Sequence, residues 1–128
     1  MKDFRKLQIW QKGIEISKMV YQLTELLPEK EKFGLVSQMN RCSVSIPSNI
    51  AEGCARSSDI ELNRFIEIAL GSAFELETQL ILTNEIYNIE IEKVMEELTI
   101  EQKMLNAYRS KLLANPNSNY QSQITNNQ

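Results

Sequence analysis

A proline lies inside a stretch of the chain that otherwise has the residue pattern of an α-helix. The stretch runs from Ser37 to Gly53, and Pro47 stands in its second half. A proline in a helix interior removes one backbone hydrogen bond and clashes with the carbonyl four residues earlier, which costs about 3 kcal/mol or more. We therefore expect neighbouring groups to compensate, and the hydroxyl and amide side chains beside the proline could satisfy the disturbed backbone group.

Two local structures are compatible with this proline. The segment could form two short helices broken at Ser45, because the residue before a proline is pushed toward extended geometry. It could also form one kinked helix that is held in place by its neighbours. Apolar or small residues continue at helical spacing on both sides of the proline, namely Leu35, Met39, Cys42, Ile46, Ile50 and Gly53 or Cys54. This continuity favours one helix over about residues 30–56, kinked at Pro47.

The segment before it, residues 7–27, predicts a helix with an unusually broad apolar arc. A helix in a monomeric bundle needs an apolar stripe of only about 100°. The excess favours a second buried surface and hence self-association, with small residues along the middle that let another helix approach. The expected interface residues are Ile9, Gly13, Ile16, Ser17 and Val20. The alternative is that this helix is simply central in the bundle.

Two more helices are expected, over about residues 59–87 and 90–113. Apolar residues of the first recur at alternating spacings of four and three, which is typical of the seam of an antiparallel bundle. The seam consists of Leu62, Ile66, Ala69, Ala73, Leu76, Leu80, Thr83 and Tyr87. We expect close packing at Gly71 and an N-cap for the last helix at Asn88. Glu101 is the one polar residue on the expected inner face of that helix. The sequence therefore predicts an all-α, antiparallel up-down-up-down four-helix bundle over residues 1–114, followed by a disordered polar tail over residues 115–128.

Composition restricts the chemistry that this bundle can perform. Histidine is absent, which removes Ser-His and Cys-His nucleophiles and the Glu-x-x-His pairs of di-iron bundles. The two cysteines, Cys42 and Cys54, are too far apart along one helix for a disulfide and lack metal-site spacing. No cofactor, metal or enzymatic activity is expected. Because no membrane span or signal peptide is visible, we expect a cytoplasmic protein without a membrane partner.

Charge is distributed unevenly along the chain. Residues 1–64 hold 10 Lys/Arg against 8 Asp/Glu, whereas residues 65–128 hold 4 against 9. The first half could therefore carry a mildly basic face that contacts RNA or DNA, and oligomerisation would multiply its weak phosphate contacts. The candidate residues are Lys2, Arg5, Lys6, Lys12, Lys18, Arg41, Arg56 and Arg64. The alternative is a solvated surface of mixed charge.

Several strings of the sequence resemble one known family. They are Ile9–Lys12, Tyr21, Phe33–Arg41, Ser45–Gly53, Arg64–Phe65, Gly71–Ser72 and Glu75–Leu80. These strings are similar to those of the four-helix-bundle proteins encoded in intervening sequences of bacterial 23S ribosomal RNA genes, a family that includes the accessory variability protein of diversity-generating retroelements. The resemblance covers residues 4 to about 113.

The resemblance implies a homopentameric, barrel-like ring and a non-enzymatic adaptor that binds nucleic acid or a nucleic-acid enzyme such as a reverse transcriptase. The alternative is a structural or protein-interaction scaffold that binds no nucleic acid. Matches to the family motif define a structural or partner site. Its residues are Trp10, Gln38, Arg41, Ser45, Pro47, Asn49, Glu52, Gly53, Gly71 and Glu75.

Overall fold

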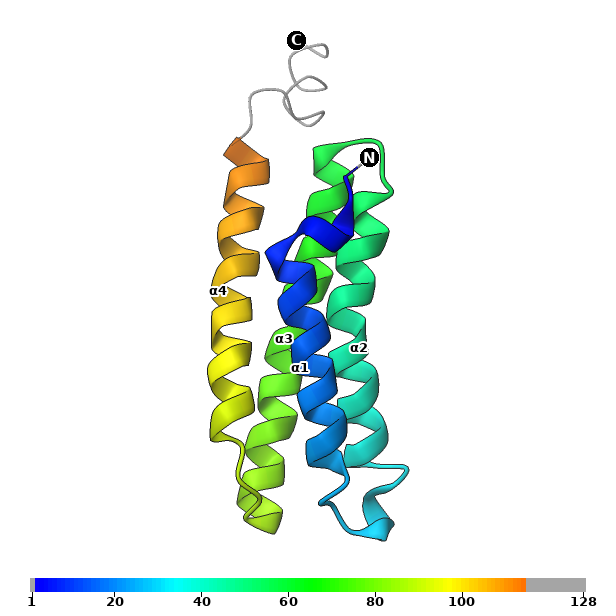
Figure 1. The fold of residues 1–128 in the computed structure, drawn as a ribbon, viewed down its shortest axis with the longest axis vertical. Helices are drawn as coiled ribbons and strands as arrows, with labels where there is room; N and C mark the ends of the chain where they lie inside the picture. Colours follow the sequence, from blue (N-terminus) through cyan, green and yellow to red (C-terminus); the bar gives the residue numbers. More distant parts are fainter. Residues whose placement is uncertain (1, 115–128) are drawn as a thin grey trace.

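The computed structural model describes residues 2–114, and the predicted tail at residues 115–128 lies outside the described residues. Four long α-helices and two short 3₁₀ turns make up this part of the chain (Figure 1). The elements in chain order are η1 (Phe4–Lys6), α1 (Gln8–Thr24), η2 (Glu29–Glu31), α2 (Leu35–Cys54), α3 (Asp59–Tyr87) and α4 (Glu92–Ala114). Residues 2–114 contain no strand. The prediction of an all-α four-helix bundle is confirmed.

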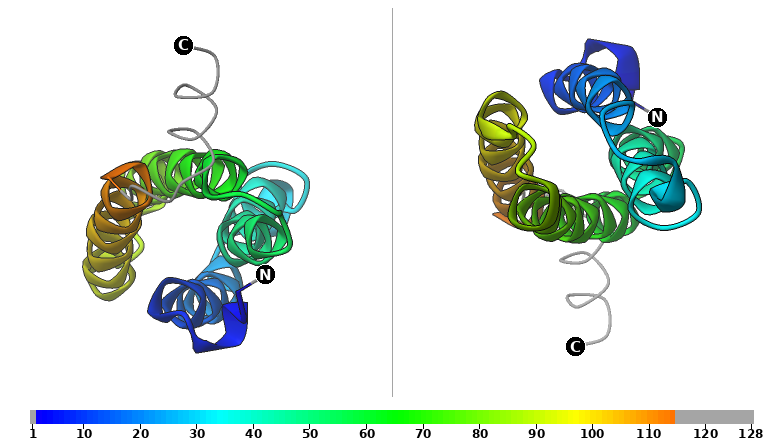
Figure 2. Two further views of the ribbon diagram at one scale, coloured as in Figure 1. Left: turned by 90° about the horizontal axis from the view of Figure 1, so that it is seen from above. Right: turned by 90° about the horizontal axis from the view of Figure 1, so that it is seen from below.

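Consecutive helices run antiparallel, so the topology is up-down-up-down (Figure 1). Seen along the bundle, the helices follow one another around the axis in chain order (Figure 2). The α2–α3 pair has the most extensive contact and the α1–α4 pair the least of the four neighbouring pairs. Because of this topology, η1, the α2–α3 turn and the end of α4 all lie at one end of the molecule, which we call the upper end (Figure 1).

Side chains from all four helices meet in one apolar core. The predicted seam of α3 is buried from Leu62 to Thr83, and only Tyr87 at its end is half-exposed. The inner face of α4 is buried as well, and it includes Glu101, the one polar residue expected there. Its buried residues are Val94, Leu98, Glu101, Leu105 and Leu112. Heptad spacing places these residues on the inner face of each helix, and burial of that face is the main source of stability.

The proline does not break its helix, because α2 is continuous from Leu35 to Cys54 with Pro47 buried inside it. The carbonyl that faces the proline belongs to Ser43, four residues earlier, and it has lost its helical donor. The Ser17 hydroxyl of α1 donates a hydrogen bond of 2.9 Å to this carbonyl. The neighbour that compensates for the proline is therefore a side chain of α1.

Gly13 lets α1 come close enough for this contact. A Cβ atom at Gly13 would lie 3.3 Å from both Cβ and Cδ of Pro47, closer than side chains normally pack. The amide of Asn49 also bonds the backbone near the proline, donating to the Ser45 carbonyl at 2.8 Å. The proline leaves the Ser43 carbonyl, not the Ser45 carbonyl, without a donor. Ser17 therefore replaces the missing hydrogen bond, and Asn49 bonds a neighbouring carbonyl.

The α1 residues expected at an oligomer interface are packed against other helices of the same chain. Ile16 and Val20 are completely buried, Ile9 is 4% exposed, and Gly13 is buried against Pro47. Ser17 is engaged by the Ser43 carbonyl. These residues are not available to a second copy, so their assignment to an oligomer interface is corrected. Most of the apolar arc of α1 is buried within one chain, whereas Ile14 and Tyr21 at its edge are 37% and 49% exposed.

Three helix ends lie at other residues than predicted. α2 begins at Leu35 rather than near residue 30, because Gly34 has a non-helical backbone and the Glu31 carboxylate accepts the first amide of the helix at 3.2 Å. Asn88 does not cap α4; its positive φ of 54° ends α3 in the left-handed conformation. Glu90 instead accepts from the amide of Glu92 at 2.9 Å. α1 ends at Thr24 instead of residue 27.

The pairing of Ser17 with the proline can be tested by a double-mutant cycle. Ser17→Ala should lower the free energy of unfolding by about 1–3 kcal/mol, because it leaves a buried carbonyl without a donor. In a Pro47→Ala background residue 47 regains its amide proton, so Ser17→Ala should then cost far less. Denaturant unfolding of the four variants measures this coupling.

Thr99→Ala is the matched control, because the exposed hydroxyl of Thr99 bonds a carbonyl within an uninterrupted helix. We expect it to change the free energy of unfolding by less than about 0.5 kcal/mol. Equal costs of Ser17→Ala in both backgrounds would contradict the assigned role of Ser17.

Candidate functional site

A polar groove of about 420 Å³ lies between α2 and α3. Its lining comes from two helical stripes, at spacings of three or four residues on each helix, so the side chains of each stripe share one face. The lining residues are Gln38, Arg41, Cys42, Ser45, Ser72, Glu75 and Gln79. A polar groove in the most extensive helix contact of the molecule is unusual, because such contacts are normally filled by apolar side chains.

A chain of hydrogen bonds joins the two walls of this groove. Asn49 donates to the Ser45 hydroxyl at 2.9 Å, and the hydroxyls of Ser45 and Ser72 lie 2.8 Å apart. On the same wall as Ser45, the Cys42 thiol donates to the Ser72 carbonyl at 3.0 Å. These contacts fix the register of α2 against α3 beside Pro47.

The Cys42 thiol is held in its protonated form. Burial, together with the negative charge and hydrogen bond of Glu75, raises its pKa to about 12. It therefore stays protonated at neutral pH, whereas nucleophilic cysteines have lowered pKa values. Cys42 and Cys54 are both free and buried. The groove has the polar lining of a binding site.

Four of the family-motif residues, Gln38, Arg41, Ser45 and Glu75, meet in this groove. The sequence reasoning missed the partners that complete it, Ser72 and Gln79. Their spacing from Glu75, of three and four residues, is a signal of a shared helix face that could have revealed them.

The remaining motif residues mostly have structural positions. Trp10 packs on Phe4, with ring centroids 5.2 Å apart. Glu52 pairs with Arg56 at 3.3 Å on the same helix. A Cβ atom at Gly53 would lie 2.8 Å from Cβ of Phe65, so the crossing of α2 and α3 requires glycine there.

Gly71 differs from Gly53. A Cβ atom there would meet nothing within 4 Å, so the expected close packing at Gly71 does not occur within the chain. The residue is exposed, because it lies on the outer side of α3.

Basic residues gather at the upper end of the bundle. The backbone amide of Lys2 bonds the Cys54 carbonyl at 3.3 Å, which brings the N-terminal segment beside the α2–α3 turn and Arg56. Lys6 and Lys111 line one hollow between α1 and α4, and Lys2 and Lys111 line another. Lys111 was not among the predicted residues, although the predicted antiparallel topology already brings the end of α4 to this end of the bundle. We call Lys2, Arg5, Lys6, Arg56 and Lys111 the basic end.

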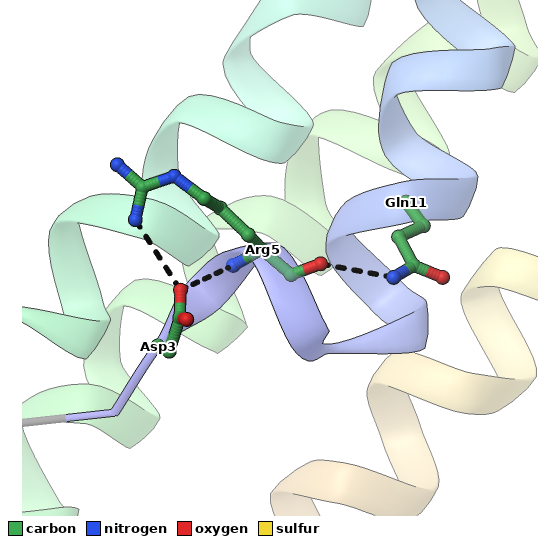
Figure 3. Close-up of polar contacts among 3 residues, drawn as sticks. All are labelled: Asp3, Arg5 and Gln11. Carbon is green, nitrogen blue, oxygen red and sulfur yellow. Dashed lines mark hydrogen bonds and ion pairs between the residues drawn. The ribbon is translucent and has the colours of Figure 1, made fainter.

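Hydrogen bonds hold η1 at the basic end (Figure 3). Asp3 accepts from the amide of Arg5 at 3.2 Å and from its guanidinium at 3.3 Å, while Gln11 of α1 donates to the Arg5 carbonyl at 2.9 Å. The guanidinium of Arg5 also lies over Phe4, and that of Arg56 lies 4.7 Å from the ring centroid of Phe65. Two arginines of the basic end, Arg5 and Arg56, thus each lie over an aromatic ring.

The other predicted basic residues do not join one surface. Lys12 pairs with Glu97 and with Glu15, and the hydrogen bond that its ammonium group donates to Glu97 raises its pKa. Arg41 lines the polar groove, and Lys18 lies in the middle of α1. Arg64 is exposed about one and a half turns into α3, on the side of the upper end.

Glu101 is a buried acid in the centre of the core. It is completely buried, and neither carboxyl oxygen has a hydrogen-bond partner among residues 2–114. A Cβ atom on Gly13 would lie 3.3 Å from one of these oxygens, which places the carboxyl group beside the Gly13–Pro47 contact. Burial raises the pKa of Glu101 to about 8, although the charge of Lys12 acts in the opposite direction. The group is therefore mostly protonated at neutral pH.

Residues 2–114 offer neither a metal-binding cluster nor a membrane-spanning helix. No group of three or more His, Cys, Asp and Glu side chains is arranged to hold a metal ion in this part of the chain. No helix there is long and apolar enough to cross a membrane.

Comparison with known proteins gives a family and a fold. The sequence model of the 23S rRNA-intervening sequence proteins matches residues 5–107. The fold is similar to the crystal structure of a protein of unknown function from the S23 ribosomal protein family of Bacteroides thetaiotaomicron, with a TM-score of 0.72 and 26% sequence identity. That similarity covers 79% of this chain and 97% of the other. No curated protein matches the sequence.

The buried acid predicts a specific pH dependence. The folded state binds the Glu101 proton more tightly than the unfolded state, so this group's contribution to stability falls as pH rises from about 4.5 to about 8. Glu101→Gln removes the titration. The stability of the variant relative to the natural protein should therefore grow by a few kcal/mol between pH 5 and pH 8, since one pKa unit corresponds to about 1.4 kcal/mol.

Denaturant unfolding at several pH values measures this difference, in which all unchanged groups cancel. Thr99→Ala, an exposed substitution on α4 that removes no titratable group, is the control and should show no such trend. A pH-independent difference for Glu101→Gln would show that the buried acid titrates normally.

Proposed function

We propose that this chain, which belongs to the 23S rRNA-intervening sequence protein family, is a non-enzymatic, homo-oligomeric adaptor that binds nucleic acid in the cytoplasm. The assembly is a ring of five copies, and nucleic acid or an enzyme bound to it, such as a reverse transcriptase, contacts the basic ends. The proposal combines an apolar surface that one chain leaves uncovered with the position of the basic residues.

The observation that carries this proposal is a second apolar face on α3. Ile68, Phe74, Ile81, Leu82 and Ile86 are exposed by 43% to 60%. At 100° per residue they occupy an arc of about 140° on the side of α3 opposite its buried seam. We call this arc the outer stripe. Large apolar side chains gathered on the exposed side of a helix mark an interaction surface, and here they lie among the charged residues Glu67, Glu75 and Glu85.

Gly71 lies within the outer stripe. Its exposed position costs helix stability of about 1 kcal/mol relative to alanine, and no contact within the chain requires it. Small residues in an apolar helix face permit another helix to approach closely. Gly71 therefore supports the outer stripe as the contact with a second copy, in place of the α1 residues.

The basic end supports the nucleic-acid part of the proposal. No ion pair involves Lys2, Lys6 or Lys111 among the described residues, so three of its cations are free to contact phosphates. A ring would repeat this modest patch once per copy, and several weak contacts then act together. The negative net charge of the whole chain, −3, restricts contact with a polyanion to this end. The alternative function is a protein-interaction scaffold, for which the outer stripe alone suffices.

Mutation of the outer stripe should change the mass of the particle. The natural chain of 14.8 kDa should scatter light as a pentamer. Phe74→Asp and Ile81→Asp should each shift the mass toward the monomer with unchanged helix content, because a charge in an apolar contact is costly while both side chains are half-exposed in one chain.

Phe33→Asp is the matched control for the loss of an exposed apolar side chain. Phe33 is 87% exposed and lies outside the outer stripe, so its variant should keep the natural mass. A natural chain that is monomeric at micromolar concentration would contradict the oligomer, and so would stripe variants that keep the natural mass.

Removing charge from the basic end should weaken RNA binding. Lys2→Gln, Lys6→Gln and Lys111→Gln together should lower the affinity for a labelled structured RNA at least about tenfold at low salt and flatten the salt dependence, because fewer counterions are released. Fluorescence anisotropy across a salt series measures both effects.

The control removes three exposed lysines near the opposite end, with Lys30→Gln, Lys32→Gln and Lys93→Gln. It should leave the affinity within about twofold if binding is local to the basic end. Equal losses in the two triple variants would indicate nonspecific attraction. Absence of RNA binding by the natural protein, with its oligomer intact, would favour the protein-interaction scaffold.

A further inference from the structure

The polar groove between α2 and α3 contains one cation and one anion that do not neutralise each other. Arg41 comes from α2 and Glu75 from α3, and both side chains line the groove. No ion pair within 4 Å involves either residue in the part of the chain that the structure describes. Both residues are exposed, so both charges are accessible from solvent.

A buried amide lies in the same groove without a partner. Gln79 is 7% exposed, and its side-chain oxygen is buried without a hydrogen bond to any described residue. Leaving such an atom unpaired costs about 1–3 kcal/mol, and native proteins rarely do so without a reason. A half-turn of the amide exchanges its oxygen and nitrogen, so either the acceptor or the donor can face the groove.

The hydroxyl pair adds a further polar group. Ser45 and Ser72 share one hydrogen bond of 2.8 Å, and Asn49 already donates to Ser45. Whichever hydroxyl donates within the pair, the other keeps a hydrogen that no bond among residues 2–114 uses. The groove therefore offers a cation, an anion, an amide and a hydroxyl within a volume of about 420 Å³. Small-molecule sites occupy about 300–1,000 Å³.

We propose that this groove binds a small zwitterion of the free α-amino acid class. Its carboxylate pairs with the Arg41 guanidinium, whose planar fork matches a carboxylate in two hydrogen bonds. Its ammonium group has three donors and no acceptor, and it bonds the Glu75 carboxylate and the Gln79 carbonyl.

Charges of both signs favour a zwitterion over other small ligands. A nucleotide phosphate would suit Arg41, but it would bring two negative charges toward Glu75. A simple cation would suit Glu75 and would be repelled by Arg41. One molecule with both charges satisfies both walls, and the site does not depend on nucleic-acid binding.

Calorimetric titration of the full chain tests this site. The probes are L-glutamine, L-arginine and L-leucine, added separately at millimolar concentration. At least one should bind, and its N-acetyl derivative and its carboxamide should each bind at least about tenfold more weakly, because each lacks one of the two charges. Arg41→Gln and Glu75→Gln should weaken binding of the amino acid by a similar factor.

Arg64→Gln and Glu85→Gln are the matched controls, because these exposed charges on α3 lie outside the groove. Both should leave binding unchanged. Gln79→Met keeps the length of the side chain and removes its carbonyl, so it should weaken binding without a fall in melting temperature.

Three results would overturn the proposal. One is that no amino acid binds to the folded natural protein. Another is that Arg41→Gln and Glu75→Gln bind the amino acid as the natural chain does. The third is that adenosine monophosphate binds more tightly than the amino acids in a manner that needs Arg41 alone. Because Arg41→Gln and Glu75→Gln change exposed side chains, both variants should fold and keep the test informative.

Discussion

The structure depends on one missing backbone hydrogen bond. Pro47 cannot donate to the Ser43 carbonyl, and the Ser17 hydroxyl of α1 takes its place. This contact requires α1 to lie directly against the proline, and Gly13 favours that approach, because a Cβ atom there would lie 3.3 Å from Pro47. A local defect in α2 thus specifies which helix packs beside it and at what height. The same register sets Ser45 opposite Ser72 on the other side of α2.

Two features of the bundle remain unexplained by the folding of a single chain, and both involve α3. Its outer stripe exposes large apolar side chains around Gly71, which a solitary bundle would replace by polar ones. Its contact with α2 contains polar and charged groups where apolar packing would be more stable. Functional surfaces commonly conflict with the local rules of folding in this way. α3 therefore connects the fold to both proposed interactions.

The sequence was sufficient for features that depend on spacing within one helix. The seam of α3 and the inner face of α4 follow from alternating intervals, and Ser58 accepts the amide of Glu61 as expected of an N-cap. It was insufficient where two distant segments meet. Ser17 could not be paired with a carbonyl 26 residues away without the register of α1 on α2. For the same reason, apolar residues of α1 were assigned to an interface although the core uses them.

The most direct test of the central claim is the mobility of a spin label on the outer stripe. Thr78 is exposed in this stripe, and both native cysteines are buried, so Thr78→Cys can be labelled selectively. If the outer stripe is covered by a second copy, the label should give the broad spectrum of an immobilised side chain. A label at exposed Lys103 on α4 should remain mobile. A mobile spectrum at residue 78 in the natural background would show that the stripe faces water and would contradict the account.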